Sequence, residues 1–197
     1  MSEDFTGSKP ELRRAFRSAR RSITVSERGR SDRAINELLL DFPAVRKAKT
    51  IAGYCAFDGE PDIAPALKHL IGKGRRVALP VIRERSAAMQ MHTWDGTALE
   101  AGPLGISAPA GGEVLDPSEL DALLIPLVAW DDRGGRLGMG GGYYDRYLAP
   151  LRRPGGPALL GVAYSLQQCR IVPTEPHDVR LHAVICENGA VPFETPQ

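Results

Sequence analysis

The order of elements along the 197-residue chain predicts an α/β fold: a single domain with a mostly parallel central sheet flanked by helices and preceded by an N-terminal helical segment. Runs typical of strands alternate with segments whose apolar residues recur at helical spacing. The run 122–130 is almost wholly apolar, which is typical of a strand buried on both faces. We expect residues 1–197 to form one domain, with the helices of residues 1–42 packed on it.

The first two expected elements are helices. Ser8 and Glu11 have the spacing of a capping box. The helix that follows has an apolar stripe formed by Leu12, Ala15, Phe16, Ala19 and Ile23. A second helix is expected to begin at a cap on Ser26 and to bury Ala34, Ile35, Leu38 and Leu39.

The rest of the chain alternates between expected strands and helices. Helices are predicted at residues 61–73 and from about 143 to 151. The strand at 89–94 alternates polar and apolar residues and is expected to be antiparallel or to lie at an edge. Residues 96–117 are rich in Gly and Pro, which indicates a surface connection. The full set of predicted strands is 50–54, 76–81, 89–94, 122–130, 159–164 and 183–185.

Composition and charge exclude several classes of protein. Hydrophobic residues make up 43% of the chain and charged residues 25%, as in soluble globular proteins, and the net charge of +1 argues against a general nucleic-acid binder. No run approaches the roughly 18 apolar residues of a membrane span, and the polar N-terminus does not resemble a signal peptide. Cys55, Cys169 and Cys186 are far apart, so no disulfide framework is indicated and a cytoplasmic location fits best.

The N-terminal helix is strongly basic. Between Lys9 and Arg30 the chain has eight basic residues and two acidic ones. A basic helix is most often a solvated face, but such an excess can also bind an anion. An RNA-binding helix is one alternative, but it would need aromatic residues interleaved with the basic ones. Phe16 belongs to the apolar stripe and faces the core, which argues against this alternative.

The segment 134–142, GGRLGMGGG, is the strongest functional signal, because six of its nine residues are glycine. It follows the most buried strand and precedes a helix, at the sheet edge where α/β proteins bind ligands. Glycines let backbone N–H groups approach a phosphate closely. The segment is not a Walker A motif, and Tyr143 stands where a dinucleotide fingerprint needs its third glycine. A simple turn needs fewer glycines, so we predict a phosphate-binding loop.

Asp145 lies in the first helical turn after this loop. An acid at that position can complement the helix dipole. Beside a bound phosphate it also suits Mg²⁺, which takes one or two carboxylates on a nucleotide.

The segment 121–148, DALLIPLVAWDDRGGRLGMGGGYYDRYL, resembles the signature of the 5-formyltetrahydrofolate cyclo-ligase family. The resemblance extends over almost the whole chain. Its other matches, in the family's order, are Lys9-x-x-Leu12-Arg13, Asp58-Gly59-Glu60-Pro61-Asp62, Met89-x-Met91, Gly105-Ile106 before Pro109, and His177-Asp178.

The resemblance implies an ATP site at the glycine loop. Lys9 and Arg13 lie four residues apart on one helix face, and with Arg136 they would neutralise the charge of the phosphates as catalytic cations. Arg17, Arg20 and Arg21 are then expected to stay mostly solvated. The implied ATP-binding set is Lys9, Arg13, Arg136, Leu137, Gly138, Met139, Gly140, Gly141, Gly142, Tyr143 and Tyr144.

The resemblance also implies a metal and a folate. Asp145 and Asp178 would hold Mg²⁺. Glu60 would accept hydrogen bonds from the pterin, although an acid before Pro61 could equally cap a helix. The implied substrate-binding set is Cys55, Glu60, Met139, Gly140 and Tyr143, with the Tyr143 ring stacked beside the pterin.

The implied reaction is the ATP-dependent cyclisation of 5-formyltetrahydrofolate to 5,10-methenyltetrahydrofolate, with release of ADP and phosphate. The formyl oxygen would attack the γ-phosphate to give an imino-phosphate, and the neighbouring folate nitrogen would then displace the phosphate. A related nucleotide-dependent ligase acting on another heterocycle is the alternative. In either case the expected partners are small molecules, with no nucleic acid and no membrane.

The chain departs from the pattern of the family at three positions. Gly141 stands where some members have a lysine, and Ala108 where an acidic residue is common. His182 stands where some members have an acid. We expect His182 and the nearby Cys186 to be structural, since no further metal ligand lies beside them.

Overall fold

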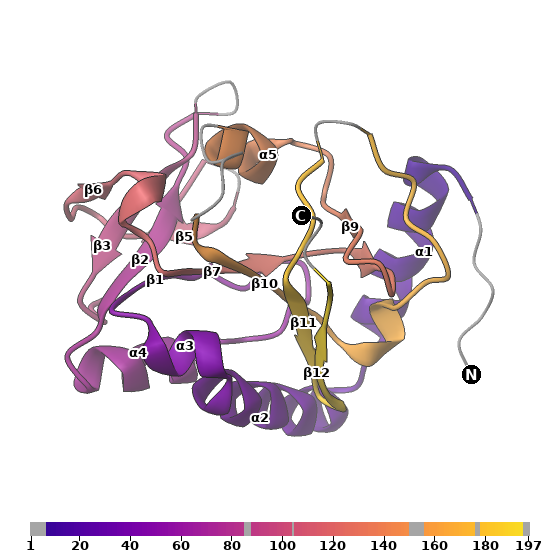
Figure 1. Ribbon diagram of the computed structural model, residues 1–197, viewed down its shortest axis with the longest axis horizontal. Helices are drawn as coiled ribbons and strands as arrows, with labels where there is room; N and C mark the ends of the chain where they lie inside the picture. The colour runs from indigo at the N-terminus through magenta and orange to yellow at the C-terminus, as the bar shows by residue number, and fades with distance from the viewer. Residues whose placement is uncertain (1–6, 85–87, 104, 150–155, 176–177, 195–197) are drawn as a thin grey trace.

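The structure is a computed structural model that describes residues 7–84, 88–103, 105–149, 156–175 and 178–194. In this part of the chain the largest sheet has the strand order β12-β11-β10-β7-β1-β2-β3-β6 (Figure 1). Its central strands are parallel: β11 (Ala183–Cys186), β10 (Ala158–Val162), β7 (Ala122–Pro126), β1 (Thr50–Ala52) and β2 (Arg76–Val81). Antiparallel pairs extend both edges through β12 (Gly189–Pro192), β3 (Gln90–Trp94) and β6 (Val114–Leu115). The predicted α/β class is confirmed, as is the antiparallel strand at 89–94.

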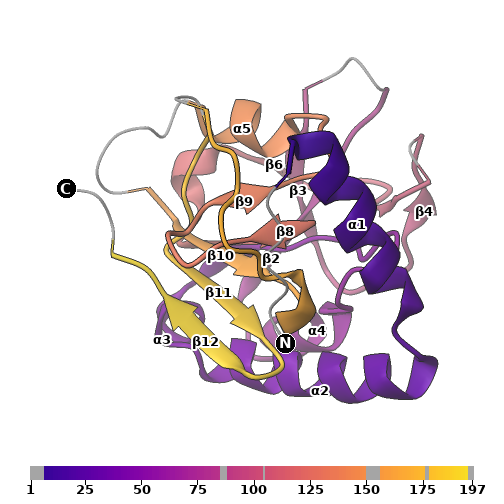
Figure 2. The same cartoon turned by 90° about the vertical axis from the view of Figure 1, so that its right-hand side faces the viewer.

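Helices cover both faces of this sheet. One face carries α2 (Val25–Asp41), α3 (Pro43–Lys47) and α4 (Ala64–Gly72), and α5 (Tyr143–Leu148) lies on the other (Figure 1). The remaining helix, α1 (Lys9–Ser22), lies beside a separate two-stranded hairpin, β8 (Ala129–Trp130) with β9 (Arg136–Leu137) (Figure 2). None of the described helices is both long and apolar enough to cross a membrane.

Alternating side chains of β7 explain why its sequence is apolar at every position. Leu124 packs into the core beneath α2 and α4, whereas Leu123 and Ile125 point into the core on the side of α5. All three side chains are fully buried. Removing apolar surface on both faces contributes roughly 25 cal/mol per Å² to folding, so this strand anchors both layers.

The expected strand 122–130 is wrong in its length, because the chain leaves the central sheet at Pro126. Beyond that point the carbonyl oxygens accept hydrogen bonds from side chains. Gln167 Nε2 donates to Leu127 O and Val128 O over 2.7 and 3.0 Å, and Arg20 Nη1 also donates to Leu127 O over 3.1 Å. The apolar run therefore forms two strands in two different sheets.

Other boundaries differ for local reasons. The second helix is capped by Thr24 instead of Ser26, because Thr24 and Glu27 form a capping box that starts it earlier. The helix expected from Pro61 begins at Ala64, where the Asp62 carboxylate accepts a hydrogen bond from Ala64 N. The helix after the glycine loop is observed to Leu148, and its expected end at Leu151 lies outside the described residues.

Short strands account for most of the remaining differences. The connection 96–117 contains a small hairpin, β4 (Glu100–Ala101) with β5 (Ser107–Ala108), and ends at β6. The edge strand β12 was not predicted from the sequence. Two- to four-residue strands carry too little periodic pattern to be recognised, so only their pairing identifies them.

Candidate active site

The glycine-rich segment divides into a turn and a loop. Gly134 and Gly135 lie in the turn between β8 and β9, which the buried Asp131 holds: its Oδ1 accepts from Gly135 N over 2.8 Å, and its Oδ2 from Val172 N over 2.8 Å. A Cβ at position 135 would lie 2.7 Å from Asp131 Oδ2. The first two glycines are therefore structural, and only residues 138–142 form a candidate phosphate loop.

This loop lies between α1 and α5. Arg13 Nε donates to Gly138 O over 2.9 Å, which fixes the start of the loop to α1. Gly140 and Gly142 have φ values of 98° and 64°, a left-handed backbone that favours glycine. Gly142 also stands at the N-cap of α5, so the N–H groups of the helix start face the same space as the loop.

A cavity of about 830 Å³ opens beside the loop. This is in the range of small-molecule sites. The residues of the sequence-based set that line it are Lys9, Arg13, Cys55, Glu60, Arg136, Leu137, Gly138, Met139, Gly140, Gly141, Gly142, Tyr143, Tyr144, Asp145 and Asp178. The structure thus brings every one of these residues to a single cavity, while their individual roles stay predictions.

The apolar residues Phe57 and Ile106 also line this cavity, and sequence reasoning assigned a role to neither of them. Ile106 belongs to the matched Gly105-Ile106 segment, whereas Phe57 directly precedes the Asp58-Gly59-Glu60 motif. The signal that could have found Phe57 was therefore its position next to a matched motif. The surfaces of both side chains suit a flat, partly apolar ligand.

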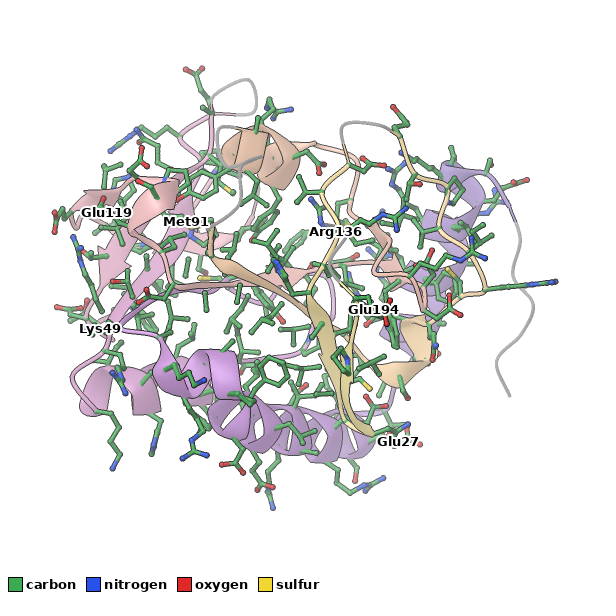
Figure 3. All side chains as sticks on the ribbon, viewed as in Figure 1. Glu27, Lys49, Met91, Glu119, Arg136 and Glu194 are labelled. Atoms are coloured by element: carbon green, nitrogen blue, oxygen red, sulfur yellow. The ribbon has the colours of Figure 1, made fainter. Side chains whose placement is uncertain are left out.

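Two cations of the cavity, Lys9 and Arg136, are paired with acids. Lys9 Nζ lies 2.8 Å from Glu175 Oε1 and 3.2 Å from Asp178 Oδ2, and these bonds raise the pKa of Lys9. Arg136 Nη2 lies 2.5 Å from Asp145 Oδ1. Figure 3 shows Arg136 inside the outline of the molecule, and its Nε is buried with no partner in the described residues. A buried donor without a partner beside a cavity fits an anionic ligand.

The carboxylates of the cavity fit a magnesium ion that is bound together with phosphates. Among the described residues no group of three or more His, Cys, Asp or Glu side chains could hold a metal ion. Asp145 and Asp178 are two carboxylates that line one cavity. Because Mg²⁺ on a nucleotide needs only one or two carboxylates, this pair fits a metal that arrives with phosphates.

Glu60 closes a tight turn and lines the cavity. Its backbone N donates to Phe57 O over 3.0 Å, and its Oε2 accepts from Phe57 N over 3.1 Å. The side chain is 8% exposed, and this burial raises its pKa to about 7 against the opposing effect of Arg20. The helix-cap alternative is wrong, because α4 begins four residues later at Ala64.

Burial also keeps the neighbouring groups neutral. It raises the pKa of the Cys55 thiol to about 11, so Cys55 is not a thiolate at neutral pH. The pKa of Tyr144 is raised mainly by burial and further by Glu60. No activated nucleophile stands among these groups.

The expectation that Arg17, Arg20 and Arg21 are mostly solvated is wrong for Arg20, whereas the side chains of Arg17 and Arg21 are 35% and 56% exposed. All three bond the carboxylate of Asp58, with Arg17 Nε 2.8 Å and Arg20 Nη2 3.2 Å from Oδ2. Arg20 is fully buried. Fully buried arginines are rare unless paired, so its helical position alone did not reveal this role.

The three departures from the family pattern have different consequences. Ala108 lines the cavity. A Cβ at Gly141 would lie 2.7 Å from the Tyr143 ring, so a larger residue there would displace the ring. His182 Nδ1 accepts a hydrogen bond from Leu159 N over 2.8 Å, which confirms its structural role.

Comparison with known sequences agrees with this geometry. A profile of the 5-formyltetrahydrofolate cyclo-ligase family matches residues 5–187. The chain is 35% identical to the 5-formyltetrahydrofolate cyclo-ligase of Escherichia coli K12 over 174 residues, covering 86% of this chain and 95% of that protein. It is 32% identical to the enzyme of the same name from Haemophilus influenzae over 184 residues, covering 91% and 98%.

Two solved structures have a similar fold. The 5,10-methenyltetrahydrofolate synthetase of Aquifex aeolicus superposes with a TM-score of 0.83 at 29% identity, covering 96% of this chain and 94% of that one. The synthetase of Mycoplasma pneumoniae gives a TM-score of 0.74 at 26% identity, covering 92% and 99%. The similarity therefore extends over the whole sheet and its helices.

The burial of Glu60 predicts a pH-dependent effect on stability. The pKa of Glu60 is about 7 in the folded protein and 4.5 ordinarily. The stability that the protonated carboxyl contributes to the folded protein is therefore complete below pH 4.5 and is lost as the pH rises through 7. Glu60→Gln should therefore gain stability relative to the wild type between pH 5 and pH 8, by up to about 3 kcal/mol. Urea unfolding at both pH values measures this gain.

Glu37→Gln, at an exposed site on α2, is the control and should show the same difference from wild type at both pH values. If the difference in unfolding free energy between Glu60→Gln and the wild type did not change with pH, the argument from the burial of Glu60 would be contradicted.

Proposed function

Because the chain belongs to the 5-formyltetrahydrofolate cyclo-ligase family, we propose that it converts 5-formyltetrahydrofolate into 5,10-methenyltetrahydrofolate with ATP in the cavity beside the glycine loop. The observation that carries the proposal is the convergence of a glycine loop, three cations and three acids on one cavity that also has the buried Glu60 carboxylate and apolar walls. Ligand sites at the carboxyl ends of parallel strands are the rule in this class of fold.

ATP occupies the loop end of the cavity in this proposal. The backbone N–H groups of 138–142 surround the phosphates, and Lys9, Arg13 and Arg136 neutralise their charge. Arg13 suits this role because Nε is already bonded to Gly138 O, which orients the guanidinium and leaves its Nη donors for a phosphate.

The formylated folate occupies the opposite end. The Glu60 carboxylate accepts hydrogen bonds from the N–H groups of the pterin, and the Tyr143 ring stacks on it. Cys55 and Phe57 also line the cavity. The neutral state of Cys55 supports a role in contact, not in nucleophilic attack.

The chemistry follows from bringing these two substrates together. The formyl oxygen attacks the γ-phosphate, ADP leaves, and the neighbouring folate nitrogen then attacks the activated carbon while phosphate departs. No side chain forms a covalent bond in this sequence. The protein contributes orientation of the two substrates and neutralisation of charge by Lys9, Arg13 and Arg136.

Asp145 and Asp178 hold Mg²⁺ in this proposal. The metal supplies positive charge next to the phosphates. In the described structure each acid pairs with a cation of the site, Asp145 with Arg136 and Asp178 with Lys9. If the two acids held the metal, Arg136 and Lys9 would be available to phosphate oxygens.

We also propose that the protein works in a reducing compartment such as the cytoplasm. Its three cysteines are free thiols, and Cys169 and Cys186 are buried. This arrangement agrees with a compartment in which disulfides are rare.

An activity assay tests the proposed function directly. The purified protein with 5-formyltetrahydrofolate, ATP and Mg²⁺ should produce the absorbance of 5,10-methenyltetrahydrofolate, in proportion to the ADP released. Reactions without ATP or without protein should remain at baseline. ATP hydrolysis that is stimulated by another heterocycle, with no methenyl product from the formylated folate, would favour the alternative substrate.

Arg13→Gln tests the phosphate-binding role of α1. Loss of one charge-assisted bond to a phosphate should lower kcat/KM for ATP by roughly 10- to 100-fold. The matched control is Arg14→Gln, because Arg14 is the neighbouring exposed arginine and does not line the cavity. Steady-state kinetics and the thermal midpoint should be measured for both variants. Equal ATP kinetics in the two would remove Arg13 from the site.

Asp145→Asn tests the metal-binding role. Loss of a carboxylate ligand should raise the Mg²⁺ concentration for half-maximal activity by about tenfold or more. Asp132→Asn, at an exposed position of the same region, is the control. If Asp145 only holds Arg136, kcat should fall while the Mg²⁺ dependence stays that of the wild type.

A further inference from the structure

The turn from Phe57 to Glu60 has an unusual backbone. Asp58 has a φ of 52° and Gly59 a φ of 79°, so both central residues are left-handed. For a residue other than glycine this conformation costs on the order of 1 kcal/mol and persists only where the surroundings hold it. The turn directs the Glu60 side chain into the cavity.

Arginines of two helices hold this turn. The Asp58 carboxylate is 4% exposed and is bonded by Arg17, Arg20 and Arg21 of α1. Arg28 of α2 donates to Gly59 O over 2.5 Å and to Arg20 O over 2.9 Å. The turn is therefore fixed from the same helix that carries Lys9 and Arg13.

Arg20 is the one of these arginines that reaches Glu60. Its Nη1 lies 3.8 Å from Glu60 Oε1 and donates to Leu127 O over 3.1 Å, while its Nε donates to Asp58 O over 3.1 Å. The side chain is fully buried. Burying an ion pair seldom stabilises a fold more than apolar residues of the same size would, so stability alone does not explain an arginine here.

We propose that Arg20 is a positioning residue for the reaction, which holds the Glu60 carboxylate in place for the folate substrate and favours its ionised form. The proposal rests on the proposed function, because it takes the folate as the ligand of Glu60. The proposal gives a role to Arg20, which does not line the cavity but acts on Glu60, which does.

The charges around Glu60 support this role. The groups that act on it are Arg20 of α1, Asp58 of its own turn, Tyr54 after β1 and Tyr144 of α5. Among these described groups Arg20 is the cation, and it opposes the effect of burial, which raises the pKa of Glu60 to about 7. Without Arg20 the carboxyl would be protonated over more of the neutral range and would accept fewer hydrogen bonds.

The first experiment titrates Glu60 in the unliganded protein. Carboxyl ¹³C shifts of labelled glutamate are followed against pH, and the Glu60 signal is assigned by its loss in Glu60→Gln. Arg20→Gln, and Arg20→Met as an apolar variant of similar length, should raise the proton affinity of Glu60 by about tenfold or more. Arg20→Lys keeps the charge and should retain most of the wild-type titration. An unchanged titration in the neutral variants would overturn the proposal.

The second experiment measures binding of 5-formyltetrahydrofolate against pH by calorimetry. At pH 7 the neutral Arg20 variants should bind about tenfold more weakly than the wild type, with recovery toward pH 9 as Glu60 ionises. Their KM for ATP should change less than about twofold. Arg28→Gln is the matched control, since Arg28 holds the same turn without reaching Glu60, and its pH profile should be that of the wild type.

Three outcomes separate the proposal from the function it rests on. A pH profile that shifts equally in Arg28→Gln would mean that any loosening of the turn has this effect, and it would overturn the role of Arg20. A Glu60 titration that shifts without any change in folate binding would instead overturn the assignment of Glu60 to the folate. Absence of methenyl product in the wild type would refute the function itself.

Discussion

At Pro126 the chain leaves the central sheet, and side chains take over the hydrogen bonds that a neighbouring strand supplies elsewhere. Leu127 O accepts from both Arg20 and Gln167. Buried carbonyl groups without a donor would cost about 1–3 kcal/mol each, so this exit from the sheet depends on those two side chains. The exit leads into the β8–β9 hairpin and the glycine loop. Arg20 also bonds Asp58, so one guanidinium joins this exit from the sheet to the turn that carries Glu60.

The same principle of paired charges extends through the cavity. Lys9 and Arg136 in the cavity each face at least one acid, and so does Arg20, which lies outside the cavity lining beside Glu60. Partly exposed pairs such as Lys9 with Glu175 contribute at most about 1 kcal/mol, and exchanging them for a phosphate or a metal is therefore inexpensive. The Arg20 pairs are fully buried and costly to open. The charges thus divide into pairs that a ligand can exchange and pairs that must stay.

Sequence reasoning could predict the α/β class and the membership of the site, but not how the site is held. Leu123 and Ile125 reveal a doubly buried strand because burial of both faces leaves a continuous apolar pattern. The glycine loop was recognisable from composition and resemblance. Arg20 was not, since its partners Asp58 and Leu127 are far away in the sequence and local periodicity carries no information on such contacts. The division of the glycine segment depends on Asp131 and Val172 in the same way.

Glu60 combines these features in one side chain. Its burial disfavours the ionised form that would bind a pterin most strongly, and Arg20 restores part of that form. A fully solvated carboxylate would ionise readily but would already be bonded to water, which weakens any exchange for a ligand. A buried carboxylate without a cation would be protonated. Burial together with one buried cation therefore gives an acceptor that is partly ionised at neutral pH and poorly hydrated. The strained turn at Asp58 is the structural means of presenting it.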